Sequence, residues 1–322
     1  SKGVVLSHET ILDRIHAAND GLCLGPEDRV IWLLSMSYHF AVSIVAYLSF
    51  GSSIVLCANH FGPTIVETIS RLRGTVIYGS PVHFELMAND NSGEMLDSVR
   101  LAISTAMSLR RETAEAFLDR FGKPLNEAYG IIEVGLPCIN ISGPRNHAGS
   151  VGQPLPAYEI HMKNIGLGED LKAIHLSGKG FFDAYYDPWQ SREELAEDGW
   201  FATGDLGRLD EDGYLYIGGR SKEVINVGGM KFFPQEVERV LESHPGVKEA
   251  CVFGYQHAHF GEVPHAHVVP AGASGTVTEA ELKTHCREHL ASFKVPDRIS
   301  EVEGLARTAS GKIIRDASRV AS

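Results

Sequence analysis

A basic, flexible stretch near the end of the chain could deliver a charged side chain to a substrate. The segment ARTASGKIIR covers residues 306–315, and its Lys312 directly follows a glycine. The chain as a whole is acidic, so this combination of small, hydroxyl-bearing and cationic residues is unusual in it. One interpretation is a frayed, solvated tail. The other is a loop that brings a lysine ammonium to an anionic substrate held elsewhere, where it would offset negative charge.

Two further segments combine side chains that suit a nucleotide. In SKGVVLSH, Lys2 and Gly3 precede an expected strand and a helix from Ser7, a setting in which backbone N–H groups and an ammonium can hold a phosphate. In NEAYGIIEVG, Tyr129 could stack on a planar base, and Glu133 could hold Mg²⁺ together with phosphate oxygens. The structural alternatives are an exposed lysine, a buried tyrosine and a solvated glutamate.

Two segments of the second half also suit a nucleotide or a moving domain. WFATGDLG places Asp205 on a tight turn, where its carboxylate could accept hydrogen bonds from two vicinal hydroxyls. A turn-stabilising aspartate is the alternative. GGRSKEVINVGGMKFF carries Arg220 at an expected domain boundary, followed by the glycine pair Gly228-Gly229. An interdomain salt bridge and a turn that needs glycine would also explain these residues.

Composition limits the classes of function. The chain has 322 residues, 43% hydrophobic and 22% charged, which suffices for two or more domains with their own cores. Its formal net charge of -12 argues against a nucleic-acid-binding surface. The five cysteines are scattered and never spaced as C-x-x-C, which predicts reduced thiols in a cytoplasmic protein. We interpret His257, His259, His265 and His267 as strand alternation and surface exposure rather than as a metal site.

The hydrophobic pattern predicts alternating strands and helices from residue 30 to about 130. Residues 30–66 contain no Asp, Glu, Lys or Arg, but polar residues divide them into strand-, helix- and strand-sized pieces. We therefore expect a buried β-α-β unit there and no membrane span. The alternation as a whole predicts a mostly parallel sheet covered by helices. Because ligands of such sheets bind at the carboxyl ends of strands, chemistry is expected in the loops after Ser35, Ser80, Ser104 and Tyr129.

The pattern changes twice beyond this α/β part, which we assign to residues 1–144. Short strands over residues 145–220, with a hairpin turn at Asp212-Gly213, predict a small antiparallel β subdomain of the same large domain. Helices and strands over residues 221–322 predict a separate, small α+β domain.

Taken together and in this order, the segments resemble the adenylate-forming superfamily of acyl-CoA synthetases, luciferases and peptide-synthetase adenylation domains. The resemblance runs along the whole chain and is greatest to an AMP-binding acyl-CoA synthetase. The motifs that carry it are Ser1-Lys2-Gly3, Tyr38-His39-Phe40, Y-G-x-x-E at 129–133, T-G-D at 203–205, G-R-x-K at 219–222 and T-x-S-G-K at 308–312. It implies an α/β large domain, present in part, and a small mobile C-terminal domain.

The resemblance also implies roles for individual residues. Lys312, Glu133 and His39 are implied as catalytic residues, with Mg²⁺ on Glu133. The implied ATP- or AMP-binding residues are Lys2, Ser104, Thr105, Ala106, Tyr129, Gly130, Ile132, Asp205 and Arg220. Lys222 is implied as the hinge, and Gly228 and Gly229 as the wall of a pantetheine tunnel. The implied acyl pocket lies near His39, Gly79, Ser80, Gly135 and Leu136.

Three functions stay open at this point. The first is an ATP-dependent carboxylate–CoA ligase that uses ATP, Mg²⁺ and coenzyme A. The second is a stand-alone adenylating enzyme that loads the phosphopantetheine of an acyl carrier protein. The third is a non-catalytic homologue that binds nucleotide or a partner. Lys222 favours the first over the second, because peptide-synthetase domains tend to have aspartate at that place.

The chain departs from the family pattern at four places. It begins inside the phosphate-loop motif, so we expect a fragment of a longer protein. Ile132 stands where the family usually has a threonine that faces the AMP phosphate, and the lost hydrogen bond to a charged group is worth about 1.5–3 kcal/mol. Ser104-Thr105-Ala106-Met107 replaces a glycine-rich segment, and residues 162–172 are short for the β subdomain.

Overall fold

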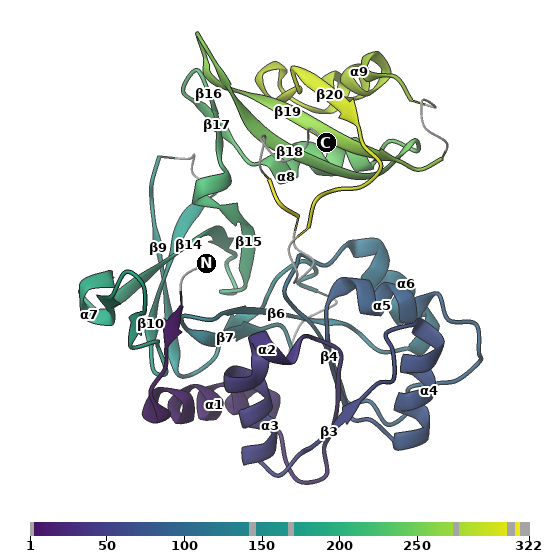
Figure 1. Cartoon of the computed structure of the whole chain (residues 1–322), viewed down its shortest axis with the longest axis vertical. Coiled ribbons are helices and arrows are strands. Elements are labelled where there is room, and N and C mark those ends of the chain that lie inside the picture. Colours follow the sequence, from purple (N-terminus) through teal and green to yellow (C-terminus); the bar gives the residue numbers. More distant parts are fainter. Residues whose placement is uncertain (1–2, 142–145, 167–170, 273–276, 308–312, 316–322) are drawn as a thin grey trace. The chain divides into compact units, whose positions relative to one another are not determined.

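The computed structural model describes residues 3–141, 146–166, 171–272, 277–307 and 313–315, and these separate into two units (Figure 1). The first unit comprises residues 1–163, 174–203 and 208–217. The second comprises residues 164–173, 204–207 and 218–322. The domain bounds expected from the sequence, 1–144, 145–220 and 221–322, stay a prediction.

A seven-stranded sheet with the order β3-β2-β4-β5-β6-β7-β8 forms the centre of the first unit. Its strands are β2 (Arg29–Trp32), β3 (Ser53–Leu56), β4 (Val76–Gly79), β5 (Leu101–Ser104), β6 (Asn126–Ile131), β7 (Gly135–Ile139) and β8 (Gln153–Pro154). The strands from β3 to β6 are parallel to one another, and β7 and β8 add antiparallel pairs. The mostly parallel sheet predicted from the sequence is therefore confirmed.

Helices cover both faces of this sheet, as its side-chain alternation requires. They are α1 (His8–Leu22), α2 (Met36–His39), α3 (Val45–Ser49), α4 (Gly62–Leu72), α5 (Pro81–Ala88) and α6 (Arg111–Phe121), with a π-helical turn over Phe40–Ile44. On β2, Val30 and Trp32 pack into one core with α1 and α3, while Ile31 packs into the other with α4, α5 and α6. The start of α1 is fixed by its N-cap residue, because the Ser7 hydroxyl accepts a hydrogen bond from the Thr10 N–H.

The charge-free stretch of residues 30–66 is a β-α-β unit, as predicted. The strand β2, the helical segment through α3 and the parallel strand β3 account for most of it. No helix in the described ranges of the chain combines the length and the apolar character needed to cross a membrane.

Two smaller sheets are formed mainly by strands that follow the seven-stranded sheet in the chain, joined by the N-terminal β1. One has the order β1-β11-β12, and the other has the order β13-β14-β10-β9 with β15 beside β14. Their elements are β1 (Val4–Val5), β9 (Tyr158–Lys163), β10 (Lys172–Gly178), β11 (Ala184–Tyr185), β12 (Gln190–Ser191), α7 (Arg192–Leu195), β13 (Ala196–Glu197), β14 (Trp200–Leu209) and β15 (Leu215–Arg220). The predicted hairpin turn at Asp212-Gly213 joins β14 to β15, and the Gly213 N–H donates to the Asp210 carbonyl at 3.0 Å.

The second unit contains a five-stranded sheet with two helices on one face (Figure 1). Its elements are β16 (Ile225–Val227), β17 (Met230–Phe232), α8 (Pro234–Glu242), β18 (Val247–His257), β19 (Gly261–Pro270), α9 (Glu279–His289) and β20 (Arg298–Glu301). The order is β17-β16-β19-β18, and β20 lies parallel to β19. Val237 and Leu241 of α8 and Leu282 and Cys286 of α9 fill the core between helices and sheet. His265 and His267 lie two residues apart in β19, on either side of the buried Ala266, which is the strand alternation that the sequence predicted.

Candidate functional site

The carboxyl ends of β4 and β5 bring two of the predicted segments together. Gly79 and Ser104, the last residues of these strands, are register partners, and the Thr105 N–H donates to the Gly79 carbonyl at 3.0 Å. Ala106, two residues after the end of β5, has a left-handed backbone conformation with a φ of 73°. Within the described residues, the Ser104 hydroxyl is buried without a hydrogen-bond partner. A buried, unpartnered hydroxyl at a strand end suits a polar ligand group.

The turn between β6 and β7 carries the Y-G-x-x-E motif. Tyr129 is buried in β6 opposite Cys138, and Glu133 lies half-buried in the turn itself. The Tyr185 hydroxyl donates to Glu133 Oε1 at 2.8 Å, which orients the carboxylate. Burial and this bond to Glu133 raise the pKa of Tyr185, so the phenol stays protonated as the donor.

A buried arginine that the sequence did not single out holds this turn. Arg14 of α1 is 1% exposed, and its Nη1 donates to the Ile132 carbonyl at 3.0 Å. Its Nε and Nη2 donate to the Gly180 carbonyl at 3.0 and 2.7 Å. Burial lowers the pKa of Arg14, but a guanidinium stays protonated, so three carbonyl contacts compensate a buried charge. Arg14 therefore fixes the backbone beside Glu133.

Side chains of the same turn differ in exposure. Ile132 is 41% exposed and Gly130 is exposed, whereas Leu136 is buried in β7. Gly135 has a φ of 106°, in the range that favours glycine. The backbone of the turn is thus fixed from inside, and the side chain at position 132 faces outward.

His39 lies in an aromatic cluster at the carboxyl end of β2. Its ring centroid is 5.4 Å from that of Trp32 and 6.3 Å from that of Tyr78. Trp32 and Tyr78 are stacked on each other, with ring centroids 5.7 Å apart. Tyr78 directly precedes Gly79, so His39 shares the strand-end edge of the sheet with Gly79 and Ser80.

A histidine pair that the sequence analysis missed lies beside Ser80. The Ser80 N–H donates to His83 Nδ1 at 3.1 Å, and the Ser80 hydroxyl lies 2.9 Å from the same atom. His83 Nε2 in turn lies 3.4 Å from His60 Nδ1. Burial, aided by the neighbouring His60, lowers the pKa of His83 to about 4, so this imidazole is neutral at pH 7. Neither histidine belongs to a recognised motif, which is why sequence reasoning passed over them.

In the second unit, the predicted ribose-binding residues meet each other. Arg220 Nε lies 3.0 Å from Asp205 Oδ1. Asp205 is 4% exposed, while the Arg220 side chain is 56% exposed. The guanidinium thus lies against the buried carboxylate, whose oxygens can accept hydrogen bonds. Asp205 lies inside β14 (Trp200–Leu209), so the tight turn expected there from the sequence was wrong.

The predicted hinge and the glycine pair follow directly in the chain. Lys222 is exposed on a single 3₁₀ turn, Ser221–Glu223. Gly228 and Gly229 form the two-residue turn between β16 and β17, with φ of 57° and 93°. Positive φ at both positions is the requirement of a type I′ hairpin, so the glycines are explained locally by the turn. These two short strands were not predicted.

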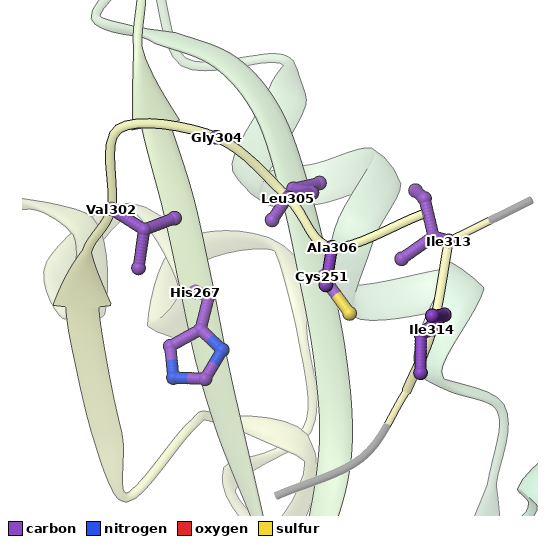
Figure 2. Close-up of a pocket in the computed structure, with 8 residues that line it drawn as sticks. All are labelled: Cys251, His267, Val302, Gly304, Leu305, Ala306, Ile313 and Ile314. Carbon is purple, nitrogen blue, oxygen red and sulfur yellow. The ribbon is translucent and has the colours of Figure 1, made fainter. Parts of the chain in front are cut away.

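Lys2 and Lys312 lie outside the described residues, but both ends of the loop that carries Lys312 are described. Arg307 and Ile313 form an antiparallel bridge, and the Ile314 N–H donates to the Ala306 carbonyl at 2.8 Å. Figure 2 shows the apolar residues of both ends gathered beside two residues of the sheet. They surround a cavity of about 10 Å³, lined by Cys251, His267, Val302, Gly304, Leu305, Ala306, Ile313 and Ile314. Such a cavity holds at most about one water molecule, so this region is packing rather than a ligand site.

Two arginines bind the same loop ends to the body of the second unit. Arg307 Nη2 lies 2.8 Å from a carboxylate oxygen of Glu249. Arg315 lies 2.9 Å from the carboxylate of Glu238 on α8 and 3.2 Å from that of Glu223, which belongs to the 3₁₀ turn of Lys222. The loop base, α8 and the predicted hinge turn are therefore linked by one charge network.

Comparisons with known proteins identify the family of this chain. Residues 1–186 match the AMP-binding enzyme family, and residues 236–312 match the AMP-binding enzyme C-terminal domain. The chain is 30% identical over 329 residues to a long-chain-fatty-acid–CoA ligase of Yersinia pestis and 32% identical over 328 residues to a sulfoacetate–CoA ligase of Cupriavidus necator. These alignments cover 98% of this chain in both cases, but the chain spans only 58% and 63% of the relatives' own lengths.

Solved structures show the same likeness. ATP-bound MatB from Rhodopseudomonas palustris has a TM-score of 0.86 at 28% identity, covering 97% of this chain and 64% of that one. The O-succinylbenzoate coenzyme A synthetase MenE from Bacillus subtilis, in complex with AMP, has a TM-score of 0.86 at 26% identity, covering 99% and 66%. The match to the AMP-binding enzyme family covers residues 1–186, which is more than half of the chain, so the chain belongs to that family.

Proposed function

We propose that the protein activates a carboxylic acid with ATP and transfers the acyl group to the thiol of coenzyme A. In the first step a carboxylate oxygen attacks the α-phosphorus, and pyrophosphate leaves. In the second step the thiol sulfur attacks the acyl carbonyl, AMP leaves and the thiol gives up its proton. Relatives that are named as CoA ligases for several different acids support this proposal.

The observation that carries the proposal is the pairing of Asp205 with Arg220. Asp205 is 4% exposed within β14, and its carboxylate lies 3.0 Å from a guanidinium that is itself 56% exposed, so both groups are placed to meet a polar ligand. Asp205 can accept from both hydroxyls of a ribose, and the exposed part of Arg220 can donate to the same sugar. We propose these two residues as the ribose contacts.

The strand-end edge of the first unit supports a base and phosphate site. We propose that Ser104, Thr105 and Ala106 border the adenine and that Tyr129 packs against it. Glu133 fits an Mg²⁺ ligand, since its half-buried carboxylate is already oriented by Tyr185. Mg²⁺, when bound, supplies positive charge next to the phosphates.

The remaining roles are proposals of the same kind. Lys312 is proposed to neutralise the carboxylate and the α-phosphate as charge moves toward pyrophosphate, and Lys222 to be the hinge that lets it leave. Gly228-Gly229 is proposed to line the pantetheine path. His39, Gly79, Ser80, Gly135 and Leu136 are proposed to border the acid, with Lys2, Gly130 and Ile132 near the phosphates.

Two alternatives concern the acceptor and catalysis. A stand-alone adenylating enzyme would pass the acyl group to carrier-protein phosphopantetheine, and a non-catalytic homologue would only bind nucleotide. Lys222 favours coenzyme A as the acceptor. We also propose a cytoplasmic location, because all five cysteines are free thiols.

Acid-dependent ATP–pyrophosphate exchange tests the proposal directly. A panel of aliphatic, aromatic and sulfonated carboxylic acids is screened with the purified protein, and the active acid is then tested with coenzyme A and with a holo carrier protein. The proposal predicts exchange with at least one acid and thioester formation with coenzyme A. ATP binding without exchange for any acid would favour the non-catalytic homologue instead.

A variant pair tests the assignment of Asp205. Asp205→Asn removes the charge that holds Arg220 and should raise the dissociation constant for ATP by roughly tenfold, the scale of one charge-assisted hydrogen bond. Asp212→Asn is the matched control, because its side chain is 74% exposed in the nearby hairpin turn. Unchanged ATP affinity by calorimetry in Asp205→Asn would leave Asp205 only as the structural partner of Arg220 in β14.

A further inference from the structure

The last turn of α9 gathers three side chains that the adenylation chemistry does not use. His285, Glu288 and His289 are separated by three and four residues, so they share one face of the helix. One ligand atom from each of them lies within 4.8 Å of the others. Arg287, two residues from His285, is on a different face and so does not oppose a cation there.

Hydrogen bonds fix which ring nitrogens are available. His285 Nε2 lies 3.0 Å from the Val240 carbonyl on α8, and a carbonyl oxygen only accepts, so Nε2 carries the proton. His289 Nδ1 lies 2.8 Å from the His285 carbonyl and is protonated for the same reason. The lone pairs are therefore on His285 Nδ1 and His289 Nε2. Histidines that bind metals are usually held this way, with the other ring nitrogen donating to a carbonyl or carboxylate.

The surroundings also favour a cation. The carboxyl end of a helix carries a partial negative charge, and α9 ends at His289. The Ser243 hydroxyl, 2.9 Å from His285 Nε2, adds a second contact that restrains this ring. Glu288 and His289 are exposed, so solvent and a metal ion reach the face freely.

We propose that His285, Glu288 and His289 bind a divalent transition-metal ion, with water in the remaining coordination positions. Two imidazole nitrogens and one carboxylate oxygen suit Zn²⁺, Ni²⁺, Co²⁺ or Cu²⁺, whereas Mg²⁺ and Ca²⁺ prefer sites built from oxygens. The ion would tie the last turn of α9 together and, through His285, hold it against α8. This site is independent of the Mg²⁺ that Glu133 is proposed to hold.

The test uses untagged protein freed of metal with a chelator and titrated with ZnCl₂ in a calorimeter at constant pH. Wild type is expected to bind one Zn²⁺ at this site, with millimolar Mg²⁺ unable to displace it. His289→Gln should weaken this binding at least about tenfold, the lower end of what even an outer-shell loss costs in metal sites. His8→Gln, at the exposed start of α1, is the matched control and should bind as wild type does.

A second readout locates the ion. Zn²⁺ should slow amide hydrogen exchange in α9 and should not do so in His289→Gln. Both variants change exposed side chains, and circular dichroism checks that they are folded. Absence of Zn²⁺ binding in wild type would overturn the proposal. So would equal affinity in wild type and His289→Gln, since the ion would then be bound by other histidines.

Discussion

Removing Arg315 should destabilise the second unit through the carboxylate that it leaves behind. Glu238 is 7% exposed, and its carboxylate accepts from Arg315 at 2.9 and 3.2 Å. Arg315→Met keeps an unbranched side chain but leaves this carboxylate buried without its cation. Removing one partner of a buried pair costs about 3–5 kcal/mol. The Val252 N–H still donates to Glu238 Oε1 at 2.8 Å, so we expect the lower end, about 3 kcal/mol.

A double-mutant cycle separates this cost from lost packing. Glu238→Gln removes the charge but keeps an oxygen that can accept from Val252. In Arg315→Met/Glu238→Gln the buried charge at position 238 is gone, and only Glu223, whose side chain is 29% exposed, still lacks the guanidinium. Most of the lost stability should therefore return. Arg239→Met is the control, because Arg239 is exposed on the same helix and should change stability by less than about 0.5 kcal/mol.

Because the chain has two units, a local readout is needed beside urea unfolding. Hydrogen exchange of the α8 amides and of the Val252 amide reports on the affected part directly. A loss of about 3 kcal/mol corresponds to roughly 100-fold faster exchange by opening of this unit. An Arg315→Met protein as stable as Arg239→Met would contradict the reasoning. A double variant no more stable than Arg315→Met would show that packing, not charge, is what Arg315 supplies.

Further predictions concern catalysis and pH. Lys312→Ala should reduce acyl-adenylate formation by orders of magnitude yet leave thioester formation from supplied acyl-adenylate nearly unchanged; equal losses in the two separately assayed half-reactions would remove its proposed role. Ile132→Thr should raise the adenylation rate, or lower the KM for ATP, by roughly tenfold if a hydroxyl there recovers a bond to phosphate; no change would favour a homologue that has lost catalysis. Burial raises the pKa of Glu127 to about 7 against a usual value near 4.5, so between these pH values the folded state binds more protons and the free energy of unfolding falls as pH rises. Glu127→Gln should flatten that fall, and unfolding measured at pH 5 and pH 8 on both proteins checks it.

The parallel sheet was predictable because strand-sized and helix-sized segments alternate along the chain, a pattern that predicts a parallel sheet covered by helices. In β2, Val30 and Trp32 enter one core and Ile31 the other, so a continuous apolar run signals burial on both faces. Strand ends then follow from the first polar residues after each run. The edge occupied by Gly79, Ser80 and Ser104 was accordingly located from sequence, and the turn at Asp212-Gly213 was located from its residue types.

Other parts of the site depend on contacts that sequence does not encode locally. Arg14 is buried in an amphipathic helix whose pattern would equally fit an exposed arginine. Its burial requires Gly180, where a Cβ would come within 2.7 Å of the Arg14 backbone nitrogen. The strands β16 and β17 have three residues each, too few for alternation to be recognised. His60 comes just before α4 and His83 lies in the first turn of α5, and they meet only because the start of α4 packs against α5.

The way Arg14 holds the Y-G-x-x-E turn bears on what an isoleucine at position 132 changes. The guanidinium contacts the carbonyl oxygens of Ile132 and Glu133, at 3.0 and 3.5 Å, rather than any side chain of the turn. Glu133 is oriented separately by Tyr185. Both restraints are indifferent to the side chain at 132, which is 41% exposed. An isoleucine in place of threonine therefore removes a donor without disturbing the backbone or the carboxylate. That is the condition under which Ile132→Thr adds a hydrogen bond without a compensating structural cost, and a fall in activity would instead place this side chain against the acid.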